Sequence, residues 1–109
     1  MTIEQSFDKT NNIMKTKTFN YYCDPSHGWV KAPVSLLKDL QIEKEITSFS
    51  YYRGGFAYLE EDMDASLLHK KLEEKGVEVK YKEFHTNKSS KIRNYNCYCH
   101  RAIFGFFQE

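Results

Sequence analysis

The sequence predicts a single domain of the α+β class, with a mostly antiparallel sheet and about two helices on one face. Three observations predict this class. The length of 109 residues suits one domain. Segments of alternating apolar and polar residues come in pairs joined by short turn sequences, as in antiparallel hairpins. Segments with helical apolar spacing follow these pairs, so the expected order is ββα–ββα–β(β).

The first strand is expected after a lead-in. Residues 1–16 show little periodicity, so we expect a flexible N-terminal segment, with the single α+β domain covering residues 17–109. From Lys17 to Cys23 the side chains alternate as in a strand. Phe19, Tyr21 and Cys23 then share one face, because successive strand side chains point to opposite sides.

A turn, a second strand and a short helix are predicted next. The residues DPSHG, Asp24 to Gly28, are dense in turn formers. Aspartate accepts hydrogen bonds from the backbone that follows it, and proline fixes φ. Extended structure resumes from Trp29 to Ala32. Pro33 suits the first turn of a helix, which we expect to end near Leu40.

The second ββα unit is centred on a predicted hairpin. Ile46–Arg53 and Phe56–Glu61 are expected strands joined by Gly54-Gly55, because a type I′ turn needs positive φ at both central residues. This register sets the following pairs on one face: Arg53 opposite Phe56, Tyr51 opposite Tyr58, and Phe49 opposite Glu60.

A longer helix and a further strand complete the predicted core. Asp62 or Asp64 is expected to cap the helix, Leu68 and Leu72 form its apolar pair, and Gly76 ends it. Val77, Val79 and Tyr81 alternate with charged residues as in a half-buried strand. Ile92–Tyr98 is a candidate strand, and the apolar tail 102–107 must dock on the domain or aggregate.

Composition excludes several classes of protein. No apolar run approaches the roughly 20 residues of a membrane span, and the N-terminus lacks the apolar centre of a signal peptide. We therefore expect a cytoplasmic protein without membrane association. Three cysteines need not pair in a reducing cytosol.

The net charge of +1 conceals an uneven distribution. Residues 1–83 carry 12 Lys/Arg and 14 Asp/Glu, a net of −2, and residues 84–109 carry 4 and 1, a net of +3. This balance predicts a basic contact face near the C-terminal third. It is far from the strongly basic composition of a dedicated nucleic-acid-binding domain.

The stretch around Cys23, Asp24 and His27 is the strongest candidate in the sequence for a reactive site. A nucleophile set needs a thiolate and an imidazole within hydrogen-bond reach, which closeness in sequence does not deliver. A structural turn with His27 at its tip is favoured over a catalytic set or a ligand-binding loop. Nothing else resembles a catalytic motif, so we expect no enzymatic activity.

A zinc site is a weaker alternative. Its ligands would come from Cys23, His27, Cys97, Cys99 and His100, since zinc takes four nitrogen or sulfur ligands. The spacing Cys97-x-Cys99 is tighter than in the common zinc knuckle. We therefore expect neither a metal nor a cofactor.

Two segments are candidates for ligand contact. The aromatic hairpin face, with Tyr51, Tyr58 and Arg53, would stack bases and meet a phosphate if exposed, and would be core if buried. The loop from His85 to Tyr95 offers hydroxyls, amides and cations of the kind that hold phosphate. The alternative is that this loop is only a solvated connection. Both questions stay open at this level.

Several stretches resemble a family of small uncharacterised proteins from phages and other mobile elements. The resemblance spans roughly Tyr21 to Tyr95, and Ser26 stands where the family pattern often has glycine. It rests on Asp24-Pro25-x-His27-Gly28-Trp29, Ser50-Tyr51, Tyr58-Leu59-Glu60-Glu61-Asp62-x-Asp64 and His85-x-Asn87-x-Ser89 with Ile92-Arg93-x-Tyr95. It implies an accessory phage protein, in the cytoplasm of a bacterial host cell, of the kind that blocks host machinery or antiviral defence.

The predicted function is therefore non-enzymatic binding that inhibits a host or antiviral-defence function. The expected partner is a nucleotide-like signal molecule, which would be sequestered, or a host protein, and exposed sheet edges favour a homodimer. The alternatives are a nucleic-acid-binding accessory protein and a small nucleotide hydrolase that uses His27 or His85. The expected ligand-binding residues are His27, Trp29, Tyr51, Arg53, Tyr58, His85, Lys91, Arg93 and Tyr95.

Overall fold

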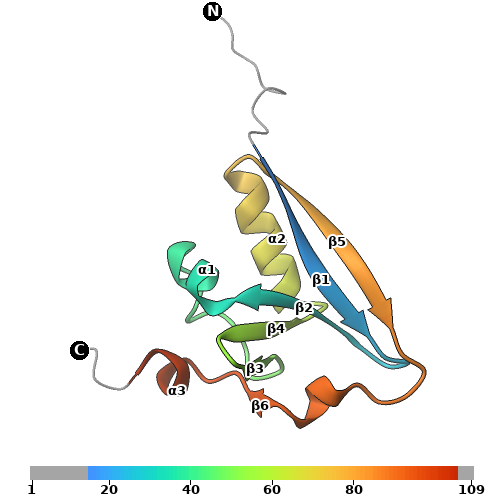
Figure 1. Cartoon of the computed structure of the whole chain (residues 1–109). Helices are drawn as coiled ribbons and strands as arrows, with labels where there is room; N and C mark the ends of the chain where they lie inside the picture. Colours follow the sequence, from blue (N-terminus) through green and yellow to red (C-terminus); the bar gives the residue numbers. More distant parts are fainter. Residues whose placement is uncertain (1–14, 106–109) are drawn as a thin grey trace, which may run out of the picture.

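The structure is a computed structural model that describes residues 15–105 (Figure 1). Its elements are β1 (Lys15–Cys23), β2 (Gly28–Pro33), α1 (Val34–Asp39), β3 (Tyr51–Arg53), β4 (Phe56–Glu60), α2 (Asp64–Glu74), β5 (Val77–His85), the 3-10 helix η2 (Lys91–Asn94), β6 (Asn96–Cys97) and α3 (His100–Phe104). The predicted α+β class and the order ββα–ββα–β(β) are confirmed.

The strands form one six-stranded sheet in the order β5-β1-β2-β4-β3-β6. Neighbouring strands are antiparallel, except that β5 runs parallel to β1. The predicted Gly54-Gly55 hairpin is confirmed, with φ of 60° and 85° at the two glycines. Its register pairs Tyr51 with Tyr58 and Arg53 with Phe56, as predicted.

The β1–β5 pair extends beyond the rest of the sheet (Figure 1). It is matched along its whole length, from Lys15 opposite Val77 to Cys23 opposite His85. By contrast, β1 pairs with β2 only over Tyr21–Cys23. The strand β1 begins at Lys15, two residues before the predicted boundary, and residues 1–14 lie outside the described part of the chain.

Both α1 and α2 pack on one face of the sheet, as predicted, and enclose the main core. Leu37 of α1 is fully buried, and Leu68 and Leu72 of α2 are each 2% exposed. The sheet contributes every second residue of its strands to this cluster, namely Phe19, Val30, Ala32, Ala57, Leu59 and Val77. Gly76, with φ of 79°, ends α2 as predicted.

A second, smaller core lies on the opposite side of the sheet, which we call the outer face. Trp29, Tyr58 and Ile92 are buried there, and Tyr22, Tyr51, Phe56 and Tyr95 surround them half-buried. Ile92 comes from η2, so the segment after β5 folds back across the sheet and covers part of this face. Successive side chains of β2 and β4 therefore contribute alternately to the two cores, one on each side of the sheet.

The predicted strand from Ile46 to Arg53 is wrong over most of its length, because only Tyr51–Arg53 is extended. The preceding residues form turns, held by the carboxylate of Asp64. Its Oδ2 accepts hydrogen bonds from the Thr47 N–H at 3.0 Å, the Thr47 hydroxyl at 2.7 Å and the Ser50 hydroxyl at 2.5 Å. Phe49 is consequently 72% exposed and does not pair with Glu60.

The predicted cap of α2 is also corrected. Asp64 is 2% exposed and engaged with Thr47 and Ser50, and the position before the helix is Met63, whose side chain gives no cap. Glu60 supplies the carboxylate instead. Its Oε1 accepts from the N–H groups of Met63 (2.7 Å) and Asp64 (3.2 Å), and its Oε2 accepts from the N–H of Asp62 (3.0 Å).

The C-terminal part departs from the predicted strand 92–98. It forms η2 and a two-residue strand, β6, whose residues Asn96 and Cys97 pair with β3. Ile103 and Phe104 of α3 pack against the main core, so the apolar tail docks as far as the structure describes it, and residues 106–109 lie outside that part. Among the described helices, none is long and apolar enough to cross a membrane.

Candidate functional site

The turn from Asp24 to Gly28 forms as predicted and is tied to a distant loop. Asp24 Oδ1 accepts from the N–H groups of Ser26 (3.0 Å) and His27 (2.9 Å), which fixes the turn. Its Oδ2 accepts from the Ser90 N–H at 2.9 Å. A Cβ at Gly28 would lie 2.6 Å from the Tyr21 hydroxyl, so a larger residue here would have to displace the Tyr21 ring.

Arg93 is engaged by the same carboxylate. Its Nε donates to Asp24 Oδ2 at 2.6 Å and its second guanidinium nitrogen donates to Oδ1 at 3.0 Å. The guanidinium also lies 5.1 Å from the centroid of the Trp29 ring. Hydrogen bonding to Asp24 raises the pKa of Arg93 further, so it stays charged. Its charge is thereby neutralised within the protein, and Arg93 is a weaker anion contact than the sequence implied.

The nine predicted site residues fall into three groups in the structure. His27, Trp29, Tyr51 and Arg93 line a small cavity of about 180 Å³. His85 and Lys91 line a second cavity of about 280 Å³. The third group is Tyr58, Tyr95 and Arg53: the two tyrosine rings lie 5.0 Å apart in an edge-on arrangement, and the Arg53 guanidinium lies 5.1 Å from the Tyr95 ring.

Part of the aromatic surface around the hairpin is buried core, and part of it is accessible. Trp29 is 2% exposed and Tyr58 is 8% exposed, so neither is available to stack on a base. Burial raises the pKa of Tyr58, as expected for a phenol within a core. The structure thus corrects their predicted role as stacking residues, because η2 and Tyr95 cover them.

Other aromatic residues of the outer face remain accessible. Phe84 is 38% exposed and stacks on Tyr22, with 5.2 Å between ring centroids. Lys82 lies 5.5 Å from the Phe84 ring, and Lys31 lies 4.3 Å from the Phe56 ring. Neither Phe84 nor Tyr22 was singled out from the sequence. The signal was present in their shared register position opposite each other on β5 and β1, which becomes visible only when the two strands are known to pair.

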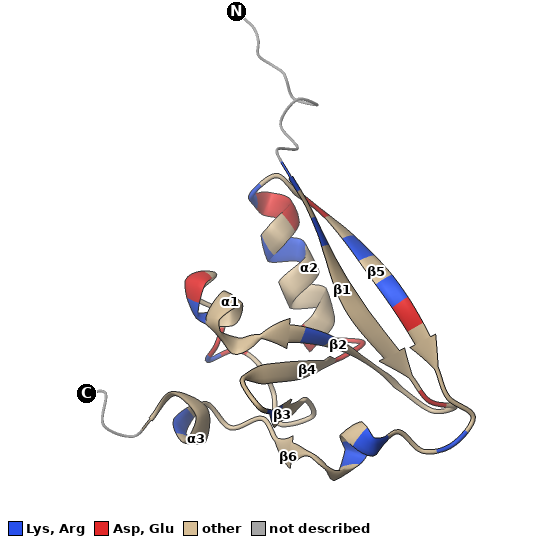
Figure 2. Ribbon diagram, in the orientation of Figure 1, with Lys and Arg blue, Asp and Glu red and all other residues tan. Residues whose placement is uncertain are grey.

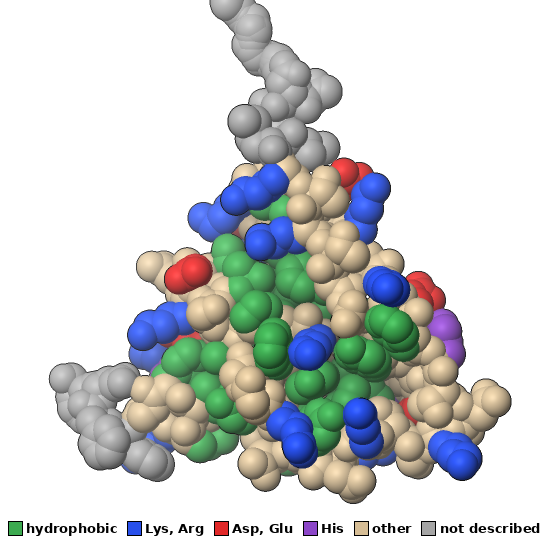
Figure 3. All heavy atoms as spheres, in the orientation of Figure 1, with side chains coloured by type: hydrophobic (Ala, Val, Ile, Leu, Met, Phe, Trp, Pro, Cys, Tyr) green, Lys and Arg blue, Asp and Glu red, His purple; other side chains and the backbone are tan. Residues whose placement is uncertain are grey.

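The outer face is basic as well as aromatic. Lysine and arginine bands mark β2, β5 and the η2 region in Figure 2. In Figure 3 hydrophobic side chains form a broad area crossed by Lys and Arg side chains, with few acidic groups among them. The predicted basic loop contributes Lys91, which borders Tyr22, Phe84 and His85 in the 280 Å³ cavity.

The weak zinc alternative is not supported by the arrangement of its residues. Cys23 lies on β1 and Cys97 on β6, and β2, β4 and β3 separate these strands in the sheet. Within residues 15–105, no three His, Cys, Asp or Glu side chains lie close enough to hold a metal ion. Burial raises the pKa of Cys23, which further disfavours its thiolate form.

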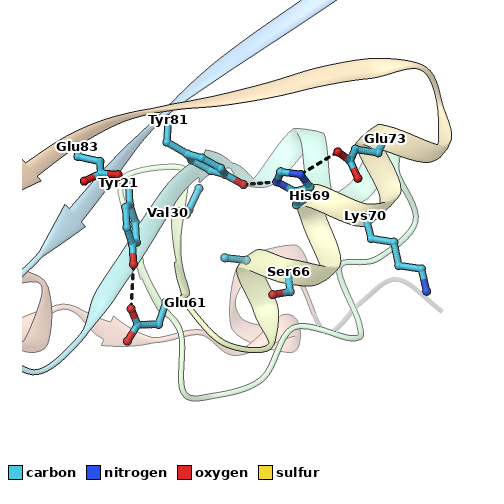
Figure 4. A pocket seen from close by; sticks show the side chains of 10 residues that line it. Tyr21, Val30, Glu61, Ser66, His69, Lys70, Glu73, Tyr81 and Glu83 are labelled. Atoms are coloured by element: carbon cyan, nitrogen blue, oxygen red, sulfur yellow. Dashed lines mark hydrogen bonds and ion pairs between the residues drawn. The ribbon is translucent and has the colours of Figure 1, made fainter. Parts of the chain in front are cut away.

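A further groove, not anticipated from the sequence, lies on the helical side of the sheet (Figure 4). It has a volume of about 340 Å³ and lies between α2 and the strands β1 and β5. We call it the tyrosine groove. Its polar lining consists of Tyr21, Glu61, Ser66, His69, Lys70, Glu73, Tyr81 and Glu83. These residues come from three separate segments, so only the parallel pairing of β5 with β1 brings them together.

Two hydrogen-bonded chains order the tyrosine groove. The Tyr21 hydroxyl donates to Glu61 Oε1 at 2.8 Å. His69 connects two partners, with Tyr81 Oη 2.6 Å from its Nδ1 and Glu73 Oε2 3.0 Å from its Nε2. The dashed lines in Figure 4 mark these contacts.

Comparison of the chain with protein-family models, with curated proteins and with solved structures finds no match.

Proposed function

We propose that this protein is a small phage-type accessory protein that acts by binding, and that the outer face of its sheet contacts a nucleotide-type ligand. One observation carries the proposal. Three cations of this face lie over aromatic rings: Lys31 over Phe56, Arg53 over Tyr95 and Lys82 over Phe84. A ligand with bases and phosphates can use both kinds of group, by stacking on rings and pairing with cations.

The exposure of these groups supports the proposal. Arg53, Lys82 and Lys91 are exposed, and no salt bridge within residues 15–105 engages any of the three. Phe84 and Tyr22 stack beside Lys91 and line a cavity of about 280 Å³. A stacked aromatic pair next to unneutralised cations is an arrangement that favours a flat, anionic ligand over a neutral one.

The biological role follows from the resemblance given above. An accessory phage protein that binds a nucleotide would sequester a signal of the host or of its antiviral defence. Binding without turnover is the mode proposed, because the exposed His85 is held by Glu83 at 3.2 Å. Cys23 lines the same cavity opposite His85, but burial raises the pKa of its thiol, which disfavours the nucleophilic thiolate.

The test is a binding titration with nucleotides, monitored by native mass spectrometry and by NMR. The panel contains cyclic and linear mononucleotides and a short oligothymidylate. We expect saturable binding to the wild type and at least tenfold weaker binding to the double variant Lys31→Gln, Lys82→Gln. Lys75→Gln, an exposed charge change at the end of α2, is the matched control and retains wild-type affinity.

The salt dependence of binding separates the outcomes. Phosphate contacts release counterions, so affinity falls with rising salt and the slope decreases by about one for each cation removed. Preference for the oligonucleotide would assign a single strand as ligand, and preference for one mononucleotide would assign a signal molecule. Absence of binding across the panel would overturn the proposal in favour of a host-protein partner. A cleaved product in the mass spectrum would overturn binding without turnover.

A further inference from the structure

The tyrosine groove lies on the helical side of the sheet and takes no part in the function proposed above. Val30 and Ala65, which are 3% and 7% exposed, contribute apolar lining. The rings of Tyr21 and Tyr81 stand 6.1 Å apart at an interplanar angle of 58°, so they form an open aromatic corner. The direction of each hydrogen bond in the groove indicates what this corner can bind.

The hydrogen bond between Tyr21 and Glu61 has only one direction. An ionised carboxylate is an acceptor without a proton, so the phenol must donate. Burial is the main cause that raises the pKa of Tyr21, and the hydrogen bond to Glu61 is the second. The phenol therefore keeps its proton. With its only proton directed at Glu61, the Tyr21 oxygen can offer a ligand nothing but lone pairs.

The second chain has the same outcome. Glu73 accepts, so His69 Nε2 carries the proton that it donates over 3.0 Å. The ring nitrogens exchange roles with the tautomer: with the proton on Nε2 and the imidazole neutral, Nδ1 is the acceptor and the Tyr81 hydroxyl donates to it over 2.6 Å. Burial and the charge of Glu73 raise the pKa of Tyr81, so this phenol also keeps its proton. In this tautomer of His69 the Tyr81 oxygen, too, is left as an acceptor.

The charges around the corner agree with this directionality. Glu61 and Glu83 add carboxylates, with side chains 31% and 57% exposed, respectively. Lys70 borders the groove, but Figure 4 shows its side chain extending away from the two tyrosines. Ser66 adds one hydroxyl, which can donate or accept. The remaining groups around the corner offer acceptors, negative charge and aromatic faces together.

We infer that the tyrosine groove binds an organic cation that carries several N–H donors, a guanidinium or alkylammonium group. Such a group would donate to the phenolic oxygens and to Glu83 while its charge lies against the ring faces. A free polyamine and an arginine side chain of a partner share this chemistry. An anion is disfavoured, because the same atoms would repel it.

The probe is agmatine, which carries a guanidinium and an ammonium group, titrated into the full-length protein and followed by NMR. We expect saturable shifts of the Tyr21, His69 and Tyr81 side-chain resonances in 150 mM sodium chloride. Glu83→Gln should weaken binding at least threefold. The fold does not depend on this carboxylate, whose contact is the exposed His85 at 3.2 Å.

Glu78→Gln is the matched control. Glu78 lies on the same strand, but on the opposite face, where its carboxylate accepts from the Thr16 hydroxyl at 3.1 Å. We expect it to retain wild-type affinity. Putrescine tests a free diamine, and a blocked arginine amide tests a side chain presented by a peptide; tighter binding of one assigns the source.

Two results would overturn the inference. One is a response that is not saturable in 150 mM salt or that weakens equally in Glu78→Gln and Glu83→Gln, because this would reflect general charge attraction. The other is saturable binding of inorganic phosphate at the same three resonances, because the groove would then present donors. Loss of nucleotide binding at the outer face would not affect either result, so the two proposals fail independently.

Discussion

Arg93 donates two hydrogen bonds, of 2.6 and 3.0 Å, to the carboxylate of Asp24, which lies 69 positions earlier in the chain. The Asp24 side chain is only 1% exposed, whereas that of Arg93 is 32% exposed. The pair joins the turn between β1 and β2 to the segment that covers the outer face. Through it, the position of η2 and of Ile92 over Trp29 depends on a turn formed much earlier in the sequence.

Replacement of Asp24 should destabilise the protein in a pH-dependent manner. Hydrogen bonding by Arg93 holds the pKa of Asp24 well below its ordinary value; burial opposes this, and the N–H groups of Ser90, His27 and Ser26 add to it. A carboxyl whose pKa falls on folding stabilises the folded state above its unfolded pKa of about 3.9, and this is lost as pH falls toward the folded value.

The measurement is the thermal unfolding midpoint of Asp24→Asn between pH 7 and pH 3. We expect a midpoint several degrees below the wild type at pH 7 and a difference that narrows below about pH 4. Asp39→Asn, at an exposed position of α1, serves as control and stays close to the wild type. A difference that is constant over the whole range would contradict the role given to the ionised carboxylate.

The cap of α2 gives a prediction that distinguishes two neighbouring acids. Glu60→Gln should lower the free energy of unfolding by about 1 kcal/mol, since its carboxylate serves three N–H groups before and at the helix start. Asp62→Asn should have little effect, because the exposed Asp62 contributes its N–H here. Burial alone would raise the pKa of Glu60, but these N–H groups outweigh it and lower the pKa. Equal losses in urea unfolding of both variants would contradict this assignment.

Ser50 is a buried link between the sheet and α2. Its hydroxyl donates to Asp64 and accepts from the Glu60 N–H at 2.9 Å. Ser50→Ala leaves both partners short of a hydrogen bond inside the protein, and we expect a loss of about 1–3 kcal/mol in urea unfolding. Ser66→Ala, at an exposed position of α2, is the comparison and should cost much less. A tolerated Ser50→Ala would mean that water replaces the hydroxyl.

The single tryptophan reports on the outer face. Because Trp29 is 2% exposed, its fluorescence should be blue-shifted and protected from iodide quenching in the folded protein. Nucleotide binding should leave this protection unchanged, since the proposed contacts are Phe84, Tyr22 and the surrounding cations. Efficient quenching by iodide in the free protein would show that η2 does not cover Trp29 in solution.

Local signals in the sequence determined much of the secondary structure. The Gly54-Gly55 turn, the alternation from Phe19 to Cys23 and the glycine after α2 each act over a few residues, because φ preferences and side-chain period are local properties. Asp24 was predicted as a turn former for the same reason. The predictions that failed involve side chains whose partners are distant. Asp64 was expected as a cap because an aspartate at a helix start can accept from backbone N–H groups, but Thr47 and Ser50 bind its carboxylate instead.

The tertiary structure alone decided which faces are buried and which residues meet. An aromatic stripe in the sequence is compatible with a buried core and with an exposed surface that stacks on bases. In the structure η2 covers Trp29 and Tyr58, which are core, and leaves Phe84 accessible. The tyrosine groove exists because α2 leads the chain to the edge of β1 away from β2, where β5 pairs with it. In this register Tyr81 lies opposite Phe19, and its ring lies beside the ring of Tyr21. Such contacts join segments about 60 residues apart, and the free energy that selects them comes from burial in the whole fold rather than from any local preference.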